Sequence, residues 1–381
     1  MTVKRRYKVL GTIAAVLLVA FLALVLTLGH NSACPSRYTG PVGERQMSAV
    51  IYQCYGGPDV LQLQRTAKPT PTEGRVLVSV YAAGVNPLDW HFLRGEPTVM
   101  RLSSGIGRPT DERLGVDFAG IVEAVGKDVT QVQVGDRVFG GAGGAFGEFV
   151  SAHVTSLARI PGNVSFAQAA AVPVAAVTAL QALRDKGELQ PGQKVLINGA
   201  SGGVGTYAVQ IAKAMGADVT GVCSTRNVEL VRSLGADHVI DYTREDFTKG
   251  SQRYDLIIDN VGNHSLLDTR KALVPRGIAV TVGASSDGRL LGPLTKMLAA
   301  QILSPFVDQQ FRPILADINA ADLTTLADLM AAGKLRAVID RTYELAQTAA
   351  AIRYVESGRA RGKVVIQLQP SEAALPTAAQ P

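Results

Sequence analysis

The chain has 381 residues, which is enough for two domains that each bury a hydrophobic core. Hydrophobic residues make up 47% of it and charged residues 18%, a balance that excludes an intrinsically disordered protein. The net charge of +6 resides almost entirely in residues 1–46, because the remaining 335 residues carry 32 basic and 31 acidic side chains. The body of the protein is therefore neutral and shows no electrostatic sign of a nucleic-acid partner.

An uncharged run of 20 residues, Val9–Leu28, follows four basic residues at the N-terminus. As a helix it would be about 30 Å long, which matches the hydrocarbon core of a bilayer. Residues 1–46 are therefore predicted to form a single-pass membrane anchor and a linker, with the helix over about 9–28. Four alternatives stay open: a signal peptide cleaved near Ser32-Ala33, a lipoprotein signal that uses Cys34, a soluble core helix, or a start codon chosen too early with the natural beginning at Met47.

Cysteine is scarce in this chain. Cys34, Cys54 and Cys223 are too few for a disulfide framework, and none lies in a CxxC or similar metal-binding spacing. The cysteine usage therefore predicts a protein made for a reducing compartment.

From Met47 onward, short apolar runs separated by glycine-containing turns predict a barrel-like, all-β region. The expected strands are Ala49–Cys54, Arg75–Ala83, Gly120–Val125, Arg137–Phe139 and Gly147–Val150. An alanine-rich helical stretch is expected over Gln168–Gly187.

After residue 187 the pattern changes to strands that alternate with helices, which is typical of a doubly wound parallel sheet. The expected strands are Lys194–Asn198, Asp218–Cys223, His238–Ile240, Tyr254–Asp259 and Ile278–Val282, with helices over Gly203–Met215 and Asn227–Leu234. Two helices (Leu323–Ala332 and Ala346–Ser357), a strand near Val338 and a last strand, Lys363–Leu368, follow. The tail, residues 370–381, is rich in Pro and Ala and is expected to be disordered.

The glycine-rich turn at 199–205 is the most informative motif in the sequence. It follows the expected strand at 194–198 and opens the expected helix, so main-chain N–H groups and the helix N-terminus would face a pyrophosphate. Strand, turn, helix and second strand occur in the order that a dinucleotide-binding unit requires. The residues expected to contact the cofactor here are Gly199, Ser201, Gly202, Gly203, Val204 and Gly205.

The end of the second strand of this unit indicates which cofactor is bound. An acidic residue there would bind the ribose 2′-hydroxyl of NAD, but the chain has Ser224, Thr225, Arg226 and Asn227 instead. Ser224 carries no charge to repel a 2′-phosphate, and Arg226 can bind one through charge-assisted hydrogen bonds. NADPH is therefore predicted in preference to NADH, with Ser224, Arg226 and Asn227 as contacts.

A set of short motifs in order resembles the quinone oxidoreductase-like branch of the medium-chain dehydrogenase/reductase superfamily. The resemblance covers residues 47–368 and rests on the segments Val50–Leu61, Gly84–Asp89, Leu114–Gly120, Val134–Val138, Ala170–Leu180, Gly199–Gly205 and Leu234–Asp237. It implies a GroES-like β-barrel catalytic domain around a Rossmann domain. The implied boundaries are 47–167 and 320–369 for the catalytic domain and 168–319 for the NADP-binding domain.

The resemblance also implies further cofactor contacts. Tyr242 lies where relatives place a residue near the adenosine end. Asn260 with Val261, and Val282 with Gly283, lie on loops where relatives hold the ribose and nicotinamide. Relatives are commonly dimers, so a homodimer is a further implication.

Zinc-dependent members of this superfamily hold their catalytic metal with a Cys, a His and a later Cys or Asp. At the matching positions this chain has Asn86, Val116 and Val174, which cannot assemble a tetrahedral zinc site. No metal is therefore predicted, and reduction of an activated acceptor is favoured over oxidation of an alcohol.

The residues expected at the acceptor are Asn86, Asp89 and Thr178. Asn86 would hydrogen-bond the acceptor carbonyl or the nicotinamide ribose, and Thr178 would contribute a hydroxyl facing the cleft. Asp89 has an alternative role, since Asp is favoured where it can cap the helix that follows.

The resulting hypothesis is a zinc-independent, NADPH-dependent reductase of a quinone or an α,β-unsaturated carbonyl compound. The alternatives are a zinc-free alcohol dehydrogenase and a membrane-bound NADPH-binding module with little catalysis. The side of the membrane stays open, because the basic N-terminus would place the body outside the cytoplasm whereas NADPH is a cytosolic cofactor.

Overall fold

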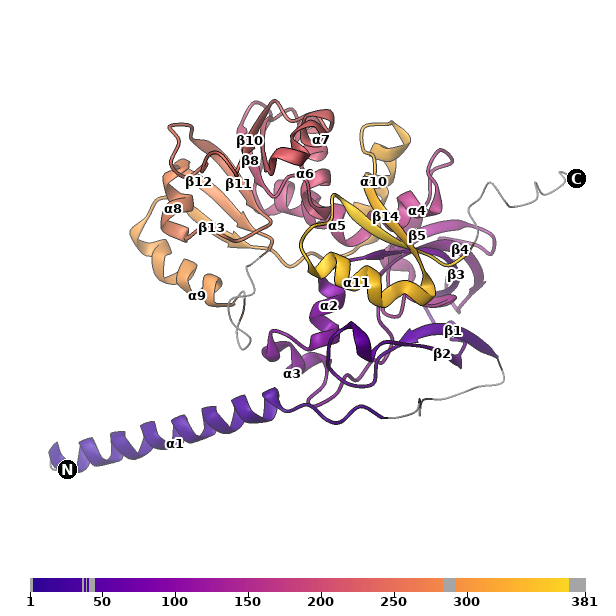
Figure 1. Ribbon diagram of the computed structural model, residues 1–381, viewed down its shortest axis with the longest axis horizontal. Helices are drawn as coiled ribbons and strands as arrows, with labels where there is room; N and C mark the ends of the chain where they lie inside the picture. The colour runs from indigo at the N-terminus through magenta and orange to yellow at the C-terminus, as the bar shows by residue number, and fades with distance from the viewer. Residues whose placement is uncertain are drawn as a thin grey trace, which may run out of the picture.

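The computed structural model describes residues 3–35, 38, 40, 45–283, 292 and 294–369. Two large sheets, each with its own helices, form the body, and a long helix extends from it at the N-terminus (Figure 1). The tail at 370–381, for which disorder is predicted, lies outside the described residues.

The first large sheet has six parallel strands in the order β10-β9-β8-β11-β12-β13. These strands are β8 (Lys194–Asn198), β9 (Asp218–Cys223), β10 (His238–Asp241), β11 (Tyr254–Asp259), β12 (Leu273–Thr281) and β13 (Gln310–Pro313). The central strands are buried on both faces, as the near-continuous apolar runs of β8 and β11 require. The Rossmann architecture predicted from the alternation of strands and helices is confirmed.

Helices connect these strands and cover the sheet. They are α6 (Gly203–Ala214), α7 (Val228–Ser233), α8 (Leu266–Lys271) and α9 (Leu294–Leu303). Helix α6 is buried along Gly205–Ala212, where it packs on α5 (Pro173–Gln181) and on β8 and β9. This packing fixes the orientation of α6 relative to the sheet, and so the position of its first turn.

The second large sheet forms the GroES-like domain and has the order β14-β15-β3-β4-β5-β7, with β6 paired to β3. Its strands are β3 (Arg75–Val85), β4 (Asp117–Val125), β5 (Arg137–Gly141), β6 (Phe149–His153), β7 (Leu157–Arg159), β14 (Ile339–Glu344) and β15 (Lys363–Gln367). The hairpin β1 (Gln46–Ile51) and β2 (Gln62–Ala67) forms a separate small sheet. Because β15 pairs with β3, the last part of the chain completes the domain that the first part began.

The remaining helices surround this second sheet. They are α2 (Pro87–Arg94), α3 (Arg101–Ser104), α4 (Phe166–Ala170), α10 (Ala320–Ala331) and α11 (Thr348–Glu356). Strands β2, β7 and β13 and helices α3, α8 and α9 have no counterpart among the elements expected from the sequence. β2 reads Gln-Leu-Gln-Arg-Thr-Ala and is mostly exposed, so it lacks the alternating apolar pattern on which a strand prediction depends.

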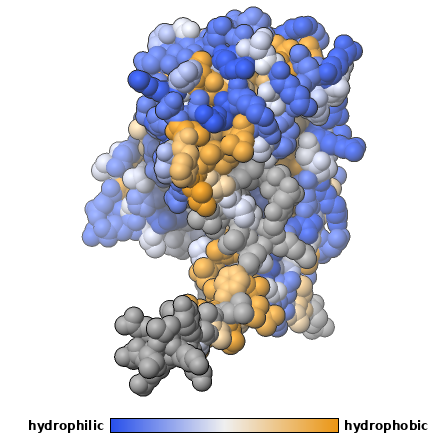
Figure 2. Space-filling model, turned by 90° about the vertical axis from the view of Figure 1, so that its left-hand side faces the viewer, coloured by the Kyte–Doolittle hydropathy of each residue, from blue (hydrophilic) through white to orange (hydrophobic). Residues whose placement is uncertain are grey.

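The N-terminal helix α1 covers Val3–Gly29, so the sequence-based helix is present. Within the residues that the structure describes, however, there is no helix with both the length and the apolarity needed to span a bilayer. The predicted transmembrane anchor is therefore not supported. Figure 2 shows that apolar side chains lie along α1 and also on the side of the body that carries α8 and α9, where Leu267, Ile302 and Phe306 are exposed.

The C-terminal end of α1 is attached to the protein body. Leu28 is buried, and the buried guanidinium of Arg101 donates hydrogen bonds to the carbonyl oxygens of Leu28 (2.9 Å) and His30 (3.1 Å). These carbonyls lie at a helix C-terminus, where a cation is favourable and where backbone acceptors lack partners within the helix. The last turn of α1 is thus integrated into the catalytic domain.

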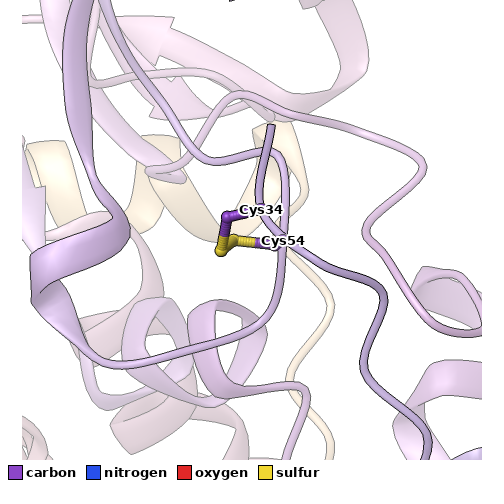
Figure 3. The surroundings of a disulfide bond; sticks show 2 residues. All are labelled: Cys34 and Cys54. Atoms are coloured by element: carbon purple, nitrogen blue, oxygen red, sulfur yellow. A yellow bond between two sulfur atoms is a disulfide. The ribbon is translucent and has the colours of Figure 1, made fainter. Parts of the chain in front are cut away.

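A disulfide bond between Cys34 and Cys54 lies next to this attachment (Figure 3). Its Cα atoms are 5.1 Å apart, although 20 positions separate the two residues in the chain. This single disulfide does not fit the prediction of a protein made for a reducing compartment. Cysteine spacing could not reveal the pair, because the fold of the segment after α1 brings Cys34 to the end of β1. The third cysteine, Cys223, is free and buried.

Candidate functional site

The glycine turn connects β8 to α6 at the carboxyl edge of the parallel sheet. Gly199 has φ of 78°, in the left-handed region that favours glycine, and the amide N–H of Gly202 donates to its carbonyl oxygen at 3.1 Å. Gly202 is extended and precedes the first helical residue, Gly203. The N-terminus of α6 therefore begins with two successive glycines, Gly202 and Gly203, which have no side chain to cover the main-chain N–H groups. The sequence predicts this arrangement for a phosphate-binding turn.

Gly205 meets a different requirement from the glycines at the start of the turn. A Cβ at this position would lie 2.1 Å from the carbonyl oxygen of Gly199, so a larger residue would force the backbone of the turn to shift. At Gly202 the nearest atom to such a Cβ is that same oxygen, at an ordinary 3.4 Å. Gly205 thus allows the helix to pack closely on the strand, whereas a Cβ at Gly202 would make only an ordinary contact.

Two loops from neighbouring strands lie beside this turn. Asn260 follows β11, and its side-chain amide donates to the carbonyl oxygen of Asn198 at 2.9 Å. Val261 is partly exposed and lies against Gly199. After β12, Gly283 packs so closely on the carbonyl oxygen of Asn260 that a Cβ would lie 2.2 Å from it. The structure therefore brings together these loops and the glycine turn, as parallel strands that end at one edge require.

The residues after β9 complete the same edge. The Asn227 side-chain amide donates to the hydroxyls of Ser201 (3.0 Å) and Ser224 (3.2 Å), so three predicted cofactor contacts form one cluster. Arg226 is exposed, and its guanidinium reaches the carbonyl oxygen of Arg359 at 3.1 Å. Tyr242 lies after β10, is 62% exposed, and is held by a backbone hydrogen bond to Cys223.

This edge has the features that a dinucleotide requires. The side-chain oxygens of Asn227 and Asn260 are buried and have no hydrogen-bond partner among the described residues. Buried acceptors of this kind are normally paired, and the ribose hydroxyls of a dinucleotide are hydrogen-bond donors. A Cβ at Gly202 would have one backbone atom within 4 Å, at 3.4 Å, and the guanidinium of Arg226 is exposed, as a phosphate site would require.

On the acceptor side, Asn86 and Asp89 lie in a buried polar cluster. Asn86 is 2% exposed, and its amide nitrogen donates to Asp117 Oδ2 at 2.9 Å. Its amide oxygen accepts a hydrogen bond of 2.5 Å from the ammonium of Lys363. The backbone N–H of Asn86 donates to Asp89 Oδ2 at 2.7 Å, at the start of α2. The side chain expected to bind the acceptor is therefore fully engaged with protein groups.

The two carboxyl groups of the cluster have different surroundings. Burial, with the nearby negative charge of Asp117, raises the pKa of Asp89 to about 7 against the opposing hydrogen bond from the Asn86 backbone and the Lys363 ammonium. Burial also raises the pKa of Asp117, but the Lys363 ammonium at 3.2 Å and hydrogen bonds from Asn86 and Val174 oppose it. Asp117 therefore has partners that stabilise its charge, whereas Asp89 holds a proton easily near neutral pH.

Thr178 lies on α5 and is also buried. Its hydroxyl donates to the carbonyl oxygen of Val174 within the same helix, at 2.6 Å. The link from α5 to the cluster is the backbone N–H of Val174, which donates to Asp117 Oδ1 at 2.9 Å. The structure thus connects Asn86 and Asp89 directly, and Thr178 only through the first turn of its helix.

Asp117 and Lys363 belong to this cluster, although the sequence did not place them there. Each opens a strand that otherwise consists mostly of buried residues, Asp117 in β4 and Lys363 in β15. The sequence signal that could have found them is a charged residue at the start of a buried strand, because a buried charge needs a partner of opposite charge. That the two charges meet each other depends on the pairing of both strands with β3.

The positions that hold zinc in zinc-dependent relatives are occupied by other contacts. Asn86 pairs with Lys363 and Asp117, and Val174 provides only a backbone N–H. Over the part of the chain that the structure describes, no three His, Cys, Asp or Glu side chains gather into a potential metal site. Independence of zinc stays a prediction.

Comparisons with known proteins agree with this two-domain arrangement. The family model for the alcohol dehydrogenase GroES-like domain matches residues 72–182, and the model for zinc-binding dehydrogenase matches residues 234–366. A mouse protein, NAD(P)H oxidoreductase RTN4IP1, mitochondrial, is 34% identical over 84% of this chain and 89% of its own length.

Solved structures match as well. The quinone oxidoreductase from Coxiella burnetii is 31% identical and has a TM-score of 0.74, with 85% of this chain and 100% of that one covered. A mycobacterial protein, Rv1454c, solved in complex with NADPH, is 26% identical with a TM-score of 0.71, over 84% and 99% of the two chains.

A Rossmann sheet with a glycine-rich turn, a GroES-like domain and relatives named NAD(P)H oxidoreductase and quinone oxidoreductase together define an NAD(P)H-dependent oxidoreductase. The chain belongs to the medium-chain dehydrogenase/reductase superfamily, and quinone oxidoreductase-like proteins are among its relatives.

Proposed function

We propose that this protein is a zinc-independent reductase that transfers hydride from NADPH to a quinone or an α,β-unsaturated carbonyl compound. The observation that carries the proposal is the cluster of Ser201, Ser224 and Asn227 at the end of β9, next to the exposed Arg226. It combines a phosphate-binding turn with a position suited to a 2′-phosphate and without the acid that selects NAD.

The preference for NADPH is supported by charge. Ser224 follows the last residue of β9, where an acidic side chain would repel a 2′-phosphate. The Arg226 guanidinium is exposed and donates to the carbonyl oxygen of Arg359, a neutral acceptor that a phosphate can displace. The mycobacterial relative solved with NADPH supports the same choice.

The choice of acceptor follows from what the cluster at Asn86 contains. Alcohol oxidation in this superfamily uses a Lewis acid to stabilise the alkoxide, and Asn86, Val116 and Val174 offer no ligand set for one. A quinone or enone accepts hydride at an electron-poor atom, and the negative charge that arrives is delocalised onto an oxygen. Solvent then supplies the proton, so the reaction consumes one hydride and one proton per acceptor.

The bound cofactor would supply the hydride. This chain would bind the cofactor through the glycine turn, Ser224, Arg226 and Asn227. Asn260, Val261, Val282 and Gly283 line the adjacent loops. Tyr242 would border the adenosine end.

A binding module with little turnover is the second candidate, and one observation favours it. Asn86, Asp89 and Thr178 are each at most 8% exposed, and Asn86 and Thr178 are committed to partners within the protein. A protein that only senses NADPH would need no more than the turn and its neighbouring loops.

The deciding experiment measures steady-state oxidation of NADPH and of NADH by the full chain with quinones, enones, ketones and aldehydes. The proposal expects turnover of quinones or enones with NADPH, a lower kcat/KM with NADH, and no dependence on added or removed zinc. Binding of NADPH without turnover of any acceptor would establish the binding module instead. Stoichiometric zinc in an active sample would contradict the proposal.

A further inference from the structure

Lys363 is a buried lysine that the proposed reaction does not yet use. Its side chain is 3% exposed, and its ammonium lies 2.5 Å from Asn86 Oδ1 and 3.2 Å from Asp117 Oδ2. An ammonium removed from water in this way requires a compensating charge, and Asp117, which is fully buried, provides it. The pair therefore belongs to the interior and differs from a solvated surface ion pair.

The hydrogen bonds around Asn86 have a defined direction. Lys363 can only donate and the Asp117 carboxylate can only accept, so the amide oxygen must face the lysine and the amide nitrogen must face the aspartate. Because Val174 N–H engages the other oxygen of Asp117, that carboxylate cannot rotate to offer a different edge. The opposite orientation of the amide would place two donors, and two acceptors, against each other.

Lys363 also adjoins the cofactor side. The residue before it, Gly362, forms a bridge with Gly202, and its N–H donates to the carbonyl oxygen of Ser201 at 2.9 Å. The aliphatic stem of Lys363 lies within ordinary van der Waals range of Gly203, since a Cβ there would lie 3.4 Å from Lys363 Cδ. One short segment thus contacts both the phosphate-binding turn and the cluster at Asn86.

We propose that Lys363 is a positioning residue, which with Asp117 fixes the orientation of the Asn86 amide and sets it in register with the glycine turn. The inference rests on the proposed function, because orientation of Asn86 matters for catalysis only if the acceptor and nicotinamide meet there.

The test separates charge burial from positioning with two variants. Lys363→Met leaves Asp117 buried without a counter-charge, so Tm should fall by about 5 °C or more. The double variant Lys363→Met/Asp117→Asn removes both charges and should recover most of that loss. The amide introduced at position 117 can donate a hydrogen bond toward Asn86. The side-chain amide of Asn86 is therefore expected to rotate by about 180°, so that its oxygen faces position 117. The kcat of the double variant should then stay at least about tenfold below wild type while the Kd for NADPH changes less than about threefold.

The matched control is Lys194→Met, which removes an exposed lysine at the opposite end of β8 and should leave Tm, kcat and Kd unchanged. A double variant with wild-type kcat would overturn the inference, because the pair would then be purely structural. A second readout does not depend on turnover: the side-chain amide resonance of Asn86 in protein labelled with ¹⁵N-asparagine. It should shift in the double variant and not in the control. If wild type turns over no acceptor, the proposed function fails, and an unshifted Asn86 resonance would separately refute the positioning role.

Discussion

Two regions of the molecule differ in the groups they present. The cofactor edge comprises the glycine turn and the residues after β9 and β11, and the acceptor-side cluster comprises Asn86, Asp89, Asp117 and Lys363. At the cofactor edge, the glycine turn presents main-chain groups, and two buried amide oxygens, of Asn227 and Asn260, have no partner within the described residues. At the acceptor side, Asn86, Asp117 and Lys363 satisfy one another. The first region therefore leaves two buried acceptors to a ligand, whereas Asn86, Asp117 and Lys363 make their hydrogen bonds within the protein.

The largest expected effect concerns the close packing at the cofactor edge. Gly205→Ala would place a methyl group 2.1 Å from the Gly199 carbonyl oxygen, so we expect a loss of about 3 kcal/mol or more in the free energy of unfolding, and loss of NADPH binding. Gly202→Ala, whose methyl group would meet only a 3.4 Å contact, should fold like wild type. Urea unfolding of both variants checks this, and equal stability would refute the division of roles within the turn.

The next effect is expected on the acceptor side and depends on pH. The pKa of Asp89 is raised to about 7, so the folded protein holds a proton that the unfolded chain releases at a lower pH. The stability contribution of protonated Asp89 is therefore full below about pH 4 and is lost as the pH rises toward 7. Asp89→Asn cannot ionise, and relative to wild type it should gain about 2 kcal/mol more at pH 8 than at pH 5. Urea unfolding at the two pH values measures this, and an equal effect at both would contradict it.

The smallest effect is expected at the exposed end of the cofactor edge. Arg226→Ala should raise the Kd for NADPH about tenfold and leave the Kd for NADH unchanged, because only NADPH carries the 2′-phosphate. The matched control is Arg232→Ala, which removes an exposed arginine of α7 that pairs with Glu229. Fluorescence titration with each nucleotide provides the measurement. A parallel loss of NADH affinity would show that Arg226 acts on the fold of the loop and not on the phosphate.

The contrast between the two regions also explains how far the sequence could predict the protein. The glycine turn is local: seven consecutive residues, 199–205, which follow β8 and run into the first turn of α6, carry the information, and β8, β9 and β11 lie at their predicted bounds. The acceptor-side cluster joins residues 86, 117 and 363, which come together only through strand pairing with β3. A family resemblance points to Asn86 and Asp89, but not to their partners.

The N-terminal segment shows a second limit of the sequence. Hydropathy predicts a helix over residues 9–28 and α1 covers it, but hydropathy cannot show that Arg101 binds the last carbonyls of that helix. The disulfide escapes prediction for the same reason, since contact between Cys34 and Cys54 is a property of the folded chain.

The two attachments at the base of α1 respond to different treatments. The hydrogen bonds from Arg101 persist as long as the catalytic domain stays folded, whereas the bond between Cys34 and Cys54 can be opened by a thiol reductant alone. We therefore expect protein produced in a reducing host to lack the disulfide and to keep only the Arg101 hydrogen bonds at the base of α1.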